Sequence, residues 1–380
     1  MNPAHIKQTL ATTPAFIVNT NILLDNLALL NKLRQQSGCK VLYSIKALPL
    51  STVLERVKEV VDGFSVSSLF EARLAHDILA GQGSIHLTTP GLNDKEWAAL
   101  SPLLTHISFN SLSQYQRFNP LAPGSIAVGL RVNPKVSILE DARYDPSRPH
   151  SKLGVSIDEL WQTAHLDTIK GLHLHNAHAL TDFQPVLKSV EKLRQYFGKD
   201  LAKLDWLNLG GGYLFKDIKN HKPFIDLVQK LRADFNIEVY IEPGKAVVDD
   251  AGYLITTVID TFMSDGKTLA ILDTSVNHNP AVFEYQLQAD LYEHNTQGVY
   301  SVVLAGNTCL AGDVFGEYRF NTPLAIGDRL IFTQMGAYSL IKAHRFNGYN
   351  LPDIYSLNGL QLTLLKHYTY QDYHQQWQVD

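Results

Sequence analysis

The feature that most constrains the fold is a regular alternation of strand-like segments with stretches of helical spacing. Eight strand candidates fall at 41–46, 63–67, 84–89, 106–110, 126–133, 170–176, 205–210 and 237–242. Between most of them, stretches such as STVLERVKEVV, LFEARLAHDILA and PVLKSVEKLRQYF repeat apolar residues with the period of a helix. Eight such units favour a closed parallel barrel over an open sheet. The sequence therefore predicts an α/β fold, a (β/α)8 TIM-like barrel over residues 21–250.

The sequence changes character after about residue 250. The segments GYLITTVIDTF, TLAILDTS, VYSVVLAG, DRLIFTQMGAY and LQLTLLKHYTY are strand-like and have no helical stretches between them. We expect an antiparallel β domain over residues 251–380. The strand-like segment AFIVNT, at 15–20, is expected to join it, so that about residues 1–20 belong to this domain. Within the barrel, residues 134–154 form a long polar loop of the kind that carries function or is mobile.

Composition limits the classes of function. The chain has 380 residues, of which 45% are hydrophobic, enough for a sizeable core. A formal net charge of −4 gives no strong field for nucleic acid or an anionic membrane. Neither a secretory signal nor an apolar run long enough to span a bilayer is found. Cys39 and Cys309 do not form a disulfide framework, which predicts a cytoplasmic protein.

Polar residues occupy the carboxyl ends of the predicted strands, where a parallel barrel carries its working side chains. In strand order they are Lys46; Ser65, Ser67 and Ser68; Asn110; Arg131 and Asn133; His173, His175 and Asn176, with His178 just beyond; Gly210, Gly211 and Gly212; and Glu242. Packing alone does not require so many polar groups at one rim. We therefore predict a functional site there.

Three of these features point to a specific chemistry, each beside a structural alternative. Lys46 is either a solvated strand end or a Schiff-base lysine. The glycines of LGGGYLF, at 209–215, either form a turn or let backbone N–H groups approach a phosphate. Glu242, in IEPGKA, either caps a helix or pairs with a cation, or it keeps a pyridine nitrogen protonated.

His173 and His175 are two residues apart and therefore share one face of a strand. With His178 nearby, a metal site is one interpretation. An imidazole stacked on a flat cofactor ring suits a pair on the sixth strand better, and a structural role is the alternative for His173. Taken together, the lysine, the glycine run, the carboxylate and the histidine indicate a pyridoxal 5′-phosphate (PLP) site.

These residues resemble those of the fold type III PLP decarboxylases, in which a PLP-binding barrel precedes a β domain like the C-terminal domain of alanine racemase. The similarity extends over nearly the whole chain. Its most specific segments are GLRVNPKVS, DPSRPHSKLG, WLNLGGG, YIEPGKA, AILDTS, GNTCLAGDVFGEYRF and GAYSLIKAHRFNG. TCLAGDVFGEY resembles the carboxynorspermidine/carboxyspermidine decarboxylase branch more than the ornithine or diaminopimelate decarboxylases. The resemblance thus implies PLP-dependent release of CO2 from a carboxylated polyamine, in spermidine biosynthesis.

The resemblance also implies how the cofactor would be held. Lys46 would form the Schiff base, His175 would stack on the pyridine ring, and Glu242 would pair with the ring nitrogen. The residues expected to hold the phosphate are Gly210, Gly211, Gly212, Gly244 and Tyr338.

Other residues would serve the substrate. In the homodimer that the resemblance implies, the partner subunit would contribute Cys309, near the reacting carbon, and Asp313, near a substrate amine. Glu71 matches a carboxylate that positions the cofactor lysine or histidine, and Arg131 matches an arginine near the active site. Asp273 is a further candidate for binding a cationic substrate.

Three positions depart from the family pattern near the expected substrate. His178-Ala179 replaces a Cys-Glu pair, Lys245 replaces a residue that is commonly acidic, and the segment containing Asn277–Pro280 replaces a Glu-Ala-His-like segment. The loss of acidic groups weakens the case for a long polycation, although four acidic residues are still available: Asp273, Glu284, Asp313 and Glu317.

The departures leave several other functions open. The first alternative is a divergent fold type III decarboxylase that acts on another basic amino acid or carboxylated amine. A racemase on the same fold is disfavoured by TCLAGD, and a non-catalytic PLP carrier by the presence of a β domain. A metal-dependent hydrolase would use His173, His175 and His178.

Overall fold

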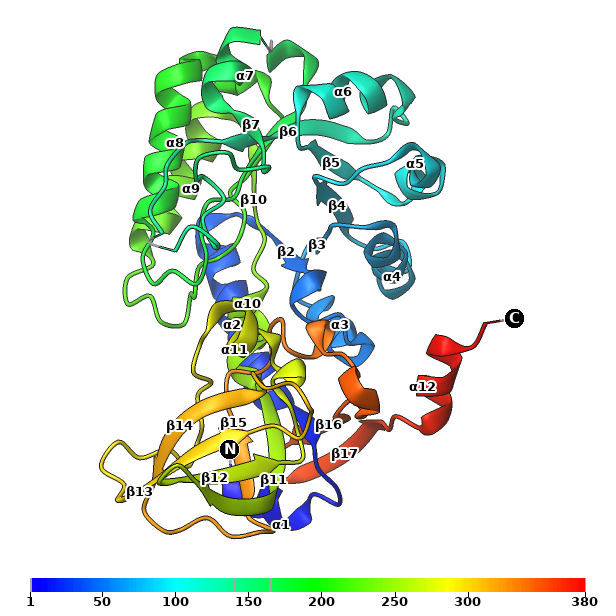
Figure 1. The fold of residues 1–380 in the computed structure, drawn as a ribbon. Helices are drawn as coiled ribbons and strands as arrows, with labels where there is room; N and C mark the ends of the chain where they lie inside the picture. Colours follow the sequence, from blue (N-terminus) through cyan, green and yellow to red (C-terminus); the bar gives the residue numbers. More distant parts are fainter. Residues whose placement is uncertain (1, 140, 164–165, 380) are drawn as a thin grey trace. The chain divides into compact units, whose positions relative to one another are not determined.

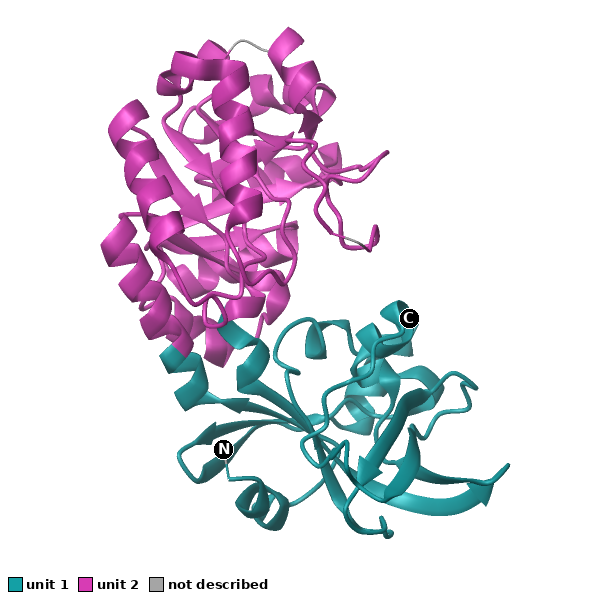
Figure 2. Ribbon diagram, turned by 90° about the vertical axis from the view of Figure 1, so that its left-hand side faces the viewer, with its two compact units in different colours: residues 1–25, 247–380 teal, residues 26–246 magenta. Residues whose placement is uncertain are grey.

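The computed structural model describes residues 2–139, 141–163 and 166–379, which are traced in Figure 1. The chain forms two compact units, coloured separately in Figure 2. One contains Asn26–Ala246. The other joins Met1–Asp25 to Val247–Asp380, so that the two ends of the chain build one unit.

The barrel unit, residues 26–246 and magenta in Figure 2, is built on a closed parallel barrel, which confirms the predicted fold and its eight strands. The strands are β2 (Lys40–Ser44), β3 (Gly63–Val66), β4 (Ser84–Thr89), β5 (His106–Phe109), β6 (Ala127–Asn133), β8 (Gly171–Leu174), β9 (Trp206–Asn208) and β10 (Glu238–Ile241). Each pairs in parallel with the next, and β10 pairs with β2 to close the barrel. All eight carboxyl ends therefore meet at one rim.

Helices follow the strands and lie outside the barrel (Figure 1). α2 (Thr20–Ser37) begins in the other unit and precedes β2. The helices that follow barrel strands are α3 (Ser51–Val57), α4 (Leu69–Leu79), α5 (Asp94–Leu100), α6 (Leu112–Phe118), α7 (Ile157–Thr163), α8 (Gln184–Phe197) and α9 (Lys222–Phe235). Ser68, Asn93 and Ser111 cap the amino ends of α4, α5 and α6 through their side-chain oxygens. On α8 the residues Val186, Val190 and Leu193 are buried, at the spacing that turns one helix face inward.

The interior of the barrel is filled near the amino ends of its strands. A Cβ on Gly171 would lie 2.0 Å from the indole of Trp206, so the glycine makes room for the large ring. The imidazoles of His86 and His106 stack at 3.8 Å beside Tyr240. These aromatic rings fill the barrel at the amino ends of its strands, so a site can form only at the carboxyl ends.

The predicted long loop after β6 leads into the short strand β7 (Val155–Ser156), which pairs with the end of β6. Side chains at the rim hold this loop. The amide of Asn110 donates to the carbonyl of Lys152 and accepts from the N–H of Gly154, at 2.8 and 2.9 Å. Tyr144 stacks on His178 at 4.2 Å. The loop is thus fixed to the strand ends at several points.

The β unit, residues 1–25 and 247–380 and teal in Figure 2, contains a sheet in the order β14-β13-β12-β11-β1-β16-β17, with β15 paired to β11. Its strands are β1 (Ala15–Asn19), β11 (Gly252–Ser264), β12 (Lys267–Leu272), β13 (Tyr300–Ala305), β14 (Val314–Phe320), β15 (Arg329–Phe332), β16 (Asp353–Asn358) and β17 (Gln361–Lys366). The N-terminal segment joins this sheet as β1, as expected.

The sheet is mixed, so the expectation of an antiparallel domain was wrong in part. β1 pairs in parallel with β16, and β12 in parallel with β13. Two parallel neighbours start at the same end of the sheet, so the chain between them needs a long connection that returns it to that end. The segment between β12 and β13, residues 273–299, provides such a connection.

The expectation that no helices occur between these strands was also wrong. Between β12 and β13 lies α11 (Pro280–Tyr285). In addition, α1 (Pro3–Thr9) precedes β1, α12 (Tyr370–Trp377) follows β17, and α10 (Lys245–Val248) crosses the boundary between the two units. Pro280 opens α11, where its missing N–H costs no hydrogen bond. Ile6 and Leu10 at α1 pack on Ile17 and Ile255 of the sheet.

Candidate active site

The carboxyl ends of four barrel strands bring charged and ring side chains into one electrostatic cluster. Lys46 lies just past β2, in the short 3-10 helix η1 (Ile45–Ala47), and Arg131 lies on β6. His175 and Glu242 each follow the last residue of a strand, β8 and β10. Each of these groups acts on the pKa of others in the cluster. The cluster therefore joins residues predicted separately from the sequence.

Lys46 has surface open to solvent, yet protein atoms crowd its amine. Desolvation lowers the pKa of this amine, and Arg131 reinforces the shift, whereas the carboxylates of Glu242 and Glu71 oppose it. No hydrogen bond to Lys46 Nζ is found in the part of the chain that the structure describes. A lowered pKa raises the fraction of neutral amine, which is the nucleophilic form.

Glu242 is buried and is held from two sides. Its Oε1 accepts a hydrogen bond of 2.8 Å from Asn208 Nδ2, and its Oε2 lies 3.3 Å from His173 Nε2. Burial alone would raise the pKa of the carboxyl, but the imidazole of His173 and the amine of Lys46 outweigh burial and lower it. Glu242 is therefore a carboxylate that carries its charge inside the barrel mouth.

His175 is held in one tautomer. The backbone N–H of Gly211 donates to His175 Nδ1 at 3.1 Å, so this nitrogen carries a lone pair. Burial lowers the pKa of the ring far below its usual value, and Arg131 and Lys46 add to the shift. The ring is consequently neutral, with its proton on Nε2.

The glycine run is required by close approaches of the backbone. A Cβ on Gly210 would meet the carbonyl of Leu174 at 2.3 Å, and one on Gly211 would meet the carbonyl of Glu242 at 2.1 Å. Gly210 has a φ of 71°, which few side chains tolerate. A substitution in this run would push apart the ends of β8 and β10.

Glu71 and Arg131 both brace the site. Glu71 accepts a hydrogen bond of 2.7 Å from the N–H of Ser67 at the start of α4, and burial raises the pKa of its carboxyl. Arg131 is buried and reaches the carbonyl of His175 at 3.4 Å. Burial lowers the pKa of Arg131 to about 10, while Glu242 opposes the shift.

The other candidate residues belong to the β unit. Asp313 is buried there and holds the loop that carries Cys309. Its carboxylate accepts from the N–H of Val276 at 2.8 Å and from the N–H and hydroxyl of Thr308 at 3.1 and 2.5 Å. Cys309 is exposed, and its N–H donates to Asn347 Oδ1 at 2.8 Å.

Asp273 and Tyr338 also lie in the β unit. The carboxylate of Asp273 accepts three hydrogen bonds within this unit, from the hydroxyls of Thr256 and Thr13 and from the N–H of Thr257. These donors tie Asp273 to the sheet. Tyr338 has a φ of 61°, unusual for a residue that is not glycine.

The predicted histidine triplet is divided between two environments. The rings of His173 and His175 are 6.4 Å apart, whereas His178 stacks on Tyr144. Among the described residues, no group of three His, Cys, Asp or Glu side chains is arranged to hold a metal ion. No helix within residues 2–139, 141–163 and 166–379 is long and apolar enough to cross a membrane.

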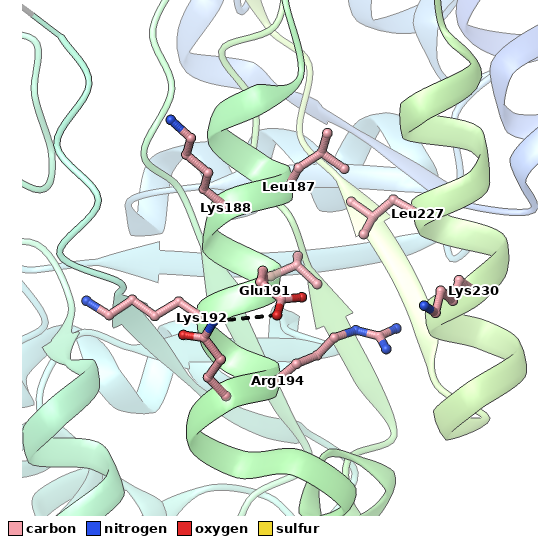
Figure 3. Close-up of a pocket in the computed structure, with 9 residues that line it drawn as sticks. Leu187, Lys188, Glu191, Lys192, Arg194, Leu227 and Lys230 are labelled. Carbon is pink, nitrogen blue, oxygen red and sulfur yellow. Dashed lines mark hydrogen bonds between the residues drawn. The ribbon is translucent and has the colours of Figure 1, made fainter.

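A separate hollow of about 580 Å³ lies outside the barrel (Figure 3). Its lining comes only from α8 and α9 and includes Lys188, Lys192 and Lys230. The dashed line in the figure is a weak hydrogen bond of 3.5 Å that joins Gln195 to Glu191. No strand end contributes to the hollow, so it is not part of the cluster around Lys46.

Two residues of the site were not predicted from the sequence. Asn208 joins Glu242 to the glycine run, because its Oδ1 also accepts from the N–H of Gly210 at 2.8 Å. Thr88 on β4 lies 3.4 Å from His173 Nδ1. The sequence held only weak signals for them. Asn208 is a polar residue directly before LGGG, and Thr88 shares one face of its strand with His86.

Comparisons with known proteins show the family to which the sequence is similar. A family model described as "Pyridoxal-dependent decarboxylase, C-terminal sheet domain" matches residues 60–336. A carboxynorspermidine/carboxyspermidine decarboxylase of Herminiimonas arsenicoxydans is 34% identical over 90% of this chain and 93% of its own. A carboxyaminopropylagmatine decarboxylase of Synechocystis is 32% identical over 95% of this chain and 94% of its own.

Solved structures give the same picture. Carboxynorspermidine decarboxylase from Campylobacter jejuni, complexed with norspermidine, superimposes with a TM-score of 0.87 at 29% identity, over 96% of this chain and 100% of that chain. A diaminopimelate decarboxylase from Helicobacter pylori has a TM-score of 0.80 at 19% identity, over 96% and 95% of the two chains, and shares the fold.

Proposed function

This chain belongs to the family of pyridoxal-dependent decarboxylases, and we propose on that premise that it releases CO2 from a carboxylated polyamine, carboxynorspermidine or carboxyspermidine. The single observation that carries the proposal is the cluster at the barrel rim, in which Lys46, His175 and Glu242 lie with the glycine run. The barrel with its following β domain is the fold type III arrangement, and PLP is the cofactor of the family.

The residues at the rim fit PLP in their chemistry. Lys46 offers an amine of lowered pKa for the aldehyde, and Glu242 offers a buried carboxylate for the ring nitrogen. In the glycine run the N–H groups of Gly210 and Gly211 already donate to Asn208 and His175, and no acceptor among the described residues is found for the N–H of Gly212, which is therefore the one offered to a phosphate. His175 offers a neutral ring for stacking.

We assign these residues the following work. Bound PLP supplies an electron sink for the electron pair that the departing carboxylate leaves on Cα. Glu242 keeps the proton on the ring nitrogen, because an anion beside that nitrogen favours its charged form. His175 excludes water from one ring face. Lys46 Nζ or Cys309 Sγ returns a proton to Cα.

Two observations support a carboxylated polyamine substrate, and one relative suggests a second candidate substrate. The relatives named carboxynorspermidine/carboxyspermidine decarboxylase are 32–34% identical to this chain, and a structural neighbour carries norspermidine. The relative named carboxyaminopropylagmatine decarboxylase is 32% identical. Because this relative is about as similar to the chain as the others, its guanidino substrate is the second candidate.

We further propose a homodimer in which Cys309 and Asp313 of one subunit complete the site of the other. The exposure of Cys309 on the β unit supports this. The hydrogen bonds of Asp313 hold the same loop in shape. In this arrangement Asp313 fixes the position of the thiol.

The test is CO2 release from the purified, PLP-loaded protein. We expect turnover of carboxynorspermidine and carboxyspermidine at rates well above those for carboxyaminopropylagmatine, ornithine, lysine, arginine and diaminopimelate. Lys46→Ala should abolish turnover, whereas Lys188→Ala, on the outer face of α8, should retain it. Preference for carboxyaminopropylagmatine would select the second candidate, and release of CO2 from none of the compounds would overturn the proposal.

A further inference from the structure

Two further polar side chains, His173 and Thr88, lie in a row with Glu242 inside the barrel. His173 is 1% exposed, and its Nε2 lies 3.3 Å from Glu242 Oε2. Nε2 makes no regular hydrogen bond with any described residue, so the carboxylate is the acceptor to which it points. On the other side of the ring, Nδ1 lies 3.4 Å from the hydroxyl of Thr88. Three side chains from β4, β8 and the end of β10 thus form a row across the barrel.

The protonation state of this row follows from its geometry. Burial lowers the pKa of the His173 ring, and Glu242 raises it by less. The ring is therefore neutral, with a proton on one of its two nitrogens. With that proton on Nε2, the ring can donate to Glu242. Nδ1 then accepts from the hydroxyl of Thr88. The opposite tautomer would turn a lone pair toward the carboxylate, which is unfavourable.

A neutral donor has a specific effect on Glu242. Asn208 already donates to Oε1, so donation from His173 would engage both carboxylate oxygens without cancelling their charge. A hydrogen bond to the charged form favours ionisation. The remaining charged neighbours are Lys46 and Arg131, at other strand ends, while His86 on β4 is neutral because burial lowers its pKa.

We propose that His173, backed by Thr88, is a positioning residue that fixes the rotamer of Glu242 and keeps its carboxylate ionised toward the pyridine nitrogen. This proposal rests on the proposed function, since it assumes PLP at the rim. It gives His173 a role other than the metal binding considered for the His173–His175 pair. It also explains why a polar threonine and an imidazole occupy the interior of the barrel.

The test uses the full-length protein, freed of PLP and titrated with PLP. His173→Phe keeps a flat ring and removes both nitrogens, so we expect PLP to bind about tenfold more weakly, the loss of one hydrogen bond to a charged group. We also expect the visible absorption of the bound cofactor to titrate at a shifted pH. In turnover, kcat should fall with little change in KM. Thr88→Val should shift the same quantities in the same direction by a smaller amount.

The controls separate this proposal from the function on which it rests. His106→Phe removes another imidazole of the barrel interior and should leave PLP affinity, spectrum and kcat unchanged. Thr88→Ser restores a hydroxyl and should restore wild-type values. If His173→Phe folds and matches the wild type in affinity and spectral titration, the proposal is wrong. If His173→Phe does not fold, the test passes to Thr88→Val, and wild-type PLP affinity and spectral titration in that variant would show that the proposal is wrong. Failure of the wild-type protein to bind PLP would instead overturn the proposed function.

Discussion

The N–H of Gly211 donates a hydrogen bond of 3.1 Å to Nδ1 of His175, which ties the glycine run after β9 to the histidine at the end of β8. One contact therefore fixes both the ring orientation and its tautomer. The same ring shares its electrostatic environment with Lys46 and Arg131. The ring that we propose to stack on the cofactor and the glycine run that we propose to hold its phosphate are thus positioned by each other.

Replacing His175 should weaken PLP binding through this contact. In His175→Phe a ring remains, but the Gly211 N–H loses its acceptor, and an unpaired buried N–H costs about 1–3 kcal/mol. We expect PLP to bind roughly tenfold to a hundredfold more weakly. Fluorescence titration of the apoprotein measures this. His175→Asn, which keeps an acceptor, should lose less, and equal losses in both variants would contradict this explanation.

Substitution of Gly211 should destabilise the barrel unit. A Cβ at this position would lie 2.1 Å from the carbonyl oxygen of Glu242, and backbone on both sides resists displacement. We expect Gly211→Ala to lower the free energy of unfolding by about 1–3 kcal/mol. Gly124→Ala is the matched control, because nothing lies within 4 Å of its added Cβ. Equal stabilities of the two variants in urea unfolding would refute the prediction.

The stacked pair His86 and His106 should make the protein sensitive to acid. Burial lowers the pKa of His106 to about 4 from its usual 6.5, and Glu238 opposes the shift. Between these values the unfolded chain binds a proton that the folded chain refuses, so stability falls as the pH falls below about 6.5. His106→Phe should reduce the loss between pH 7 and pH 4 by no more than about 3 kcal/mol. An unchanged pH dependence of urea unfolding would contradict this assignment.

The two cysteines should differ in reactivity. Cys39 is buried, which raises the pKa of its thiol to about 11, whereas Cys309 is exposed. Because the thiolate is the reactive form, a thiol reagent should label Cys309 in the native protein and Cys39 only after unfolding. Labelling should block CO2 release, and Cys309→Ala should lower kcat. Full activity after stoichiometric labelling would exclude Cys309 from the site.

The barrel could be predicted from the sequence because its strands are apolar runs with helices between them. β14 and β16 were not predicted as strands, and α11 was not predicted as a helix. β14, VFGEYRF, includes two charged residues, because its side chains alternate between buried and exposed faces. The mixed pairing of β12 with β13 depends on a long connection, which a local pattern does not reveal.

The rim residues were predictable because position at a strand end is a local property. Lys46, His175 and Glu242 each occupy such a place in the sequence. Asn208 and Thr88 act through neighbours on other strands, and their contacts depend on the register between strands. Asn208 pairs in register with His173 on one side and with Tyr240 on the other. Barrel closure sets this register, so the sequence alone did not identify either residue.

The central claim is that Lys46 binds the cofactor through its amine. The most direct measurement is reduction of the PLP-loaded protein with borohydride, followed by digestion and mass spectrometry of the peptides. We expect one stable phosphopyridoxyl group per chain, attached to Lys46. A modified lysine elsewhere, or no modification of a protein saturated with PLP, would contradict it.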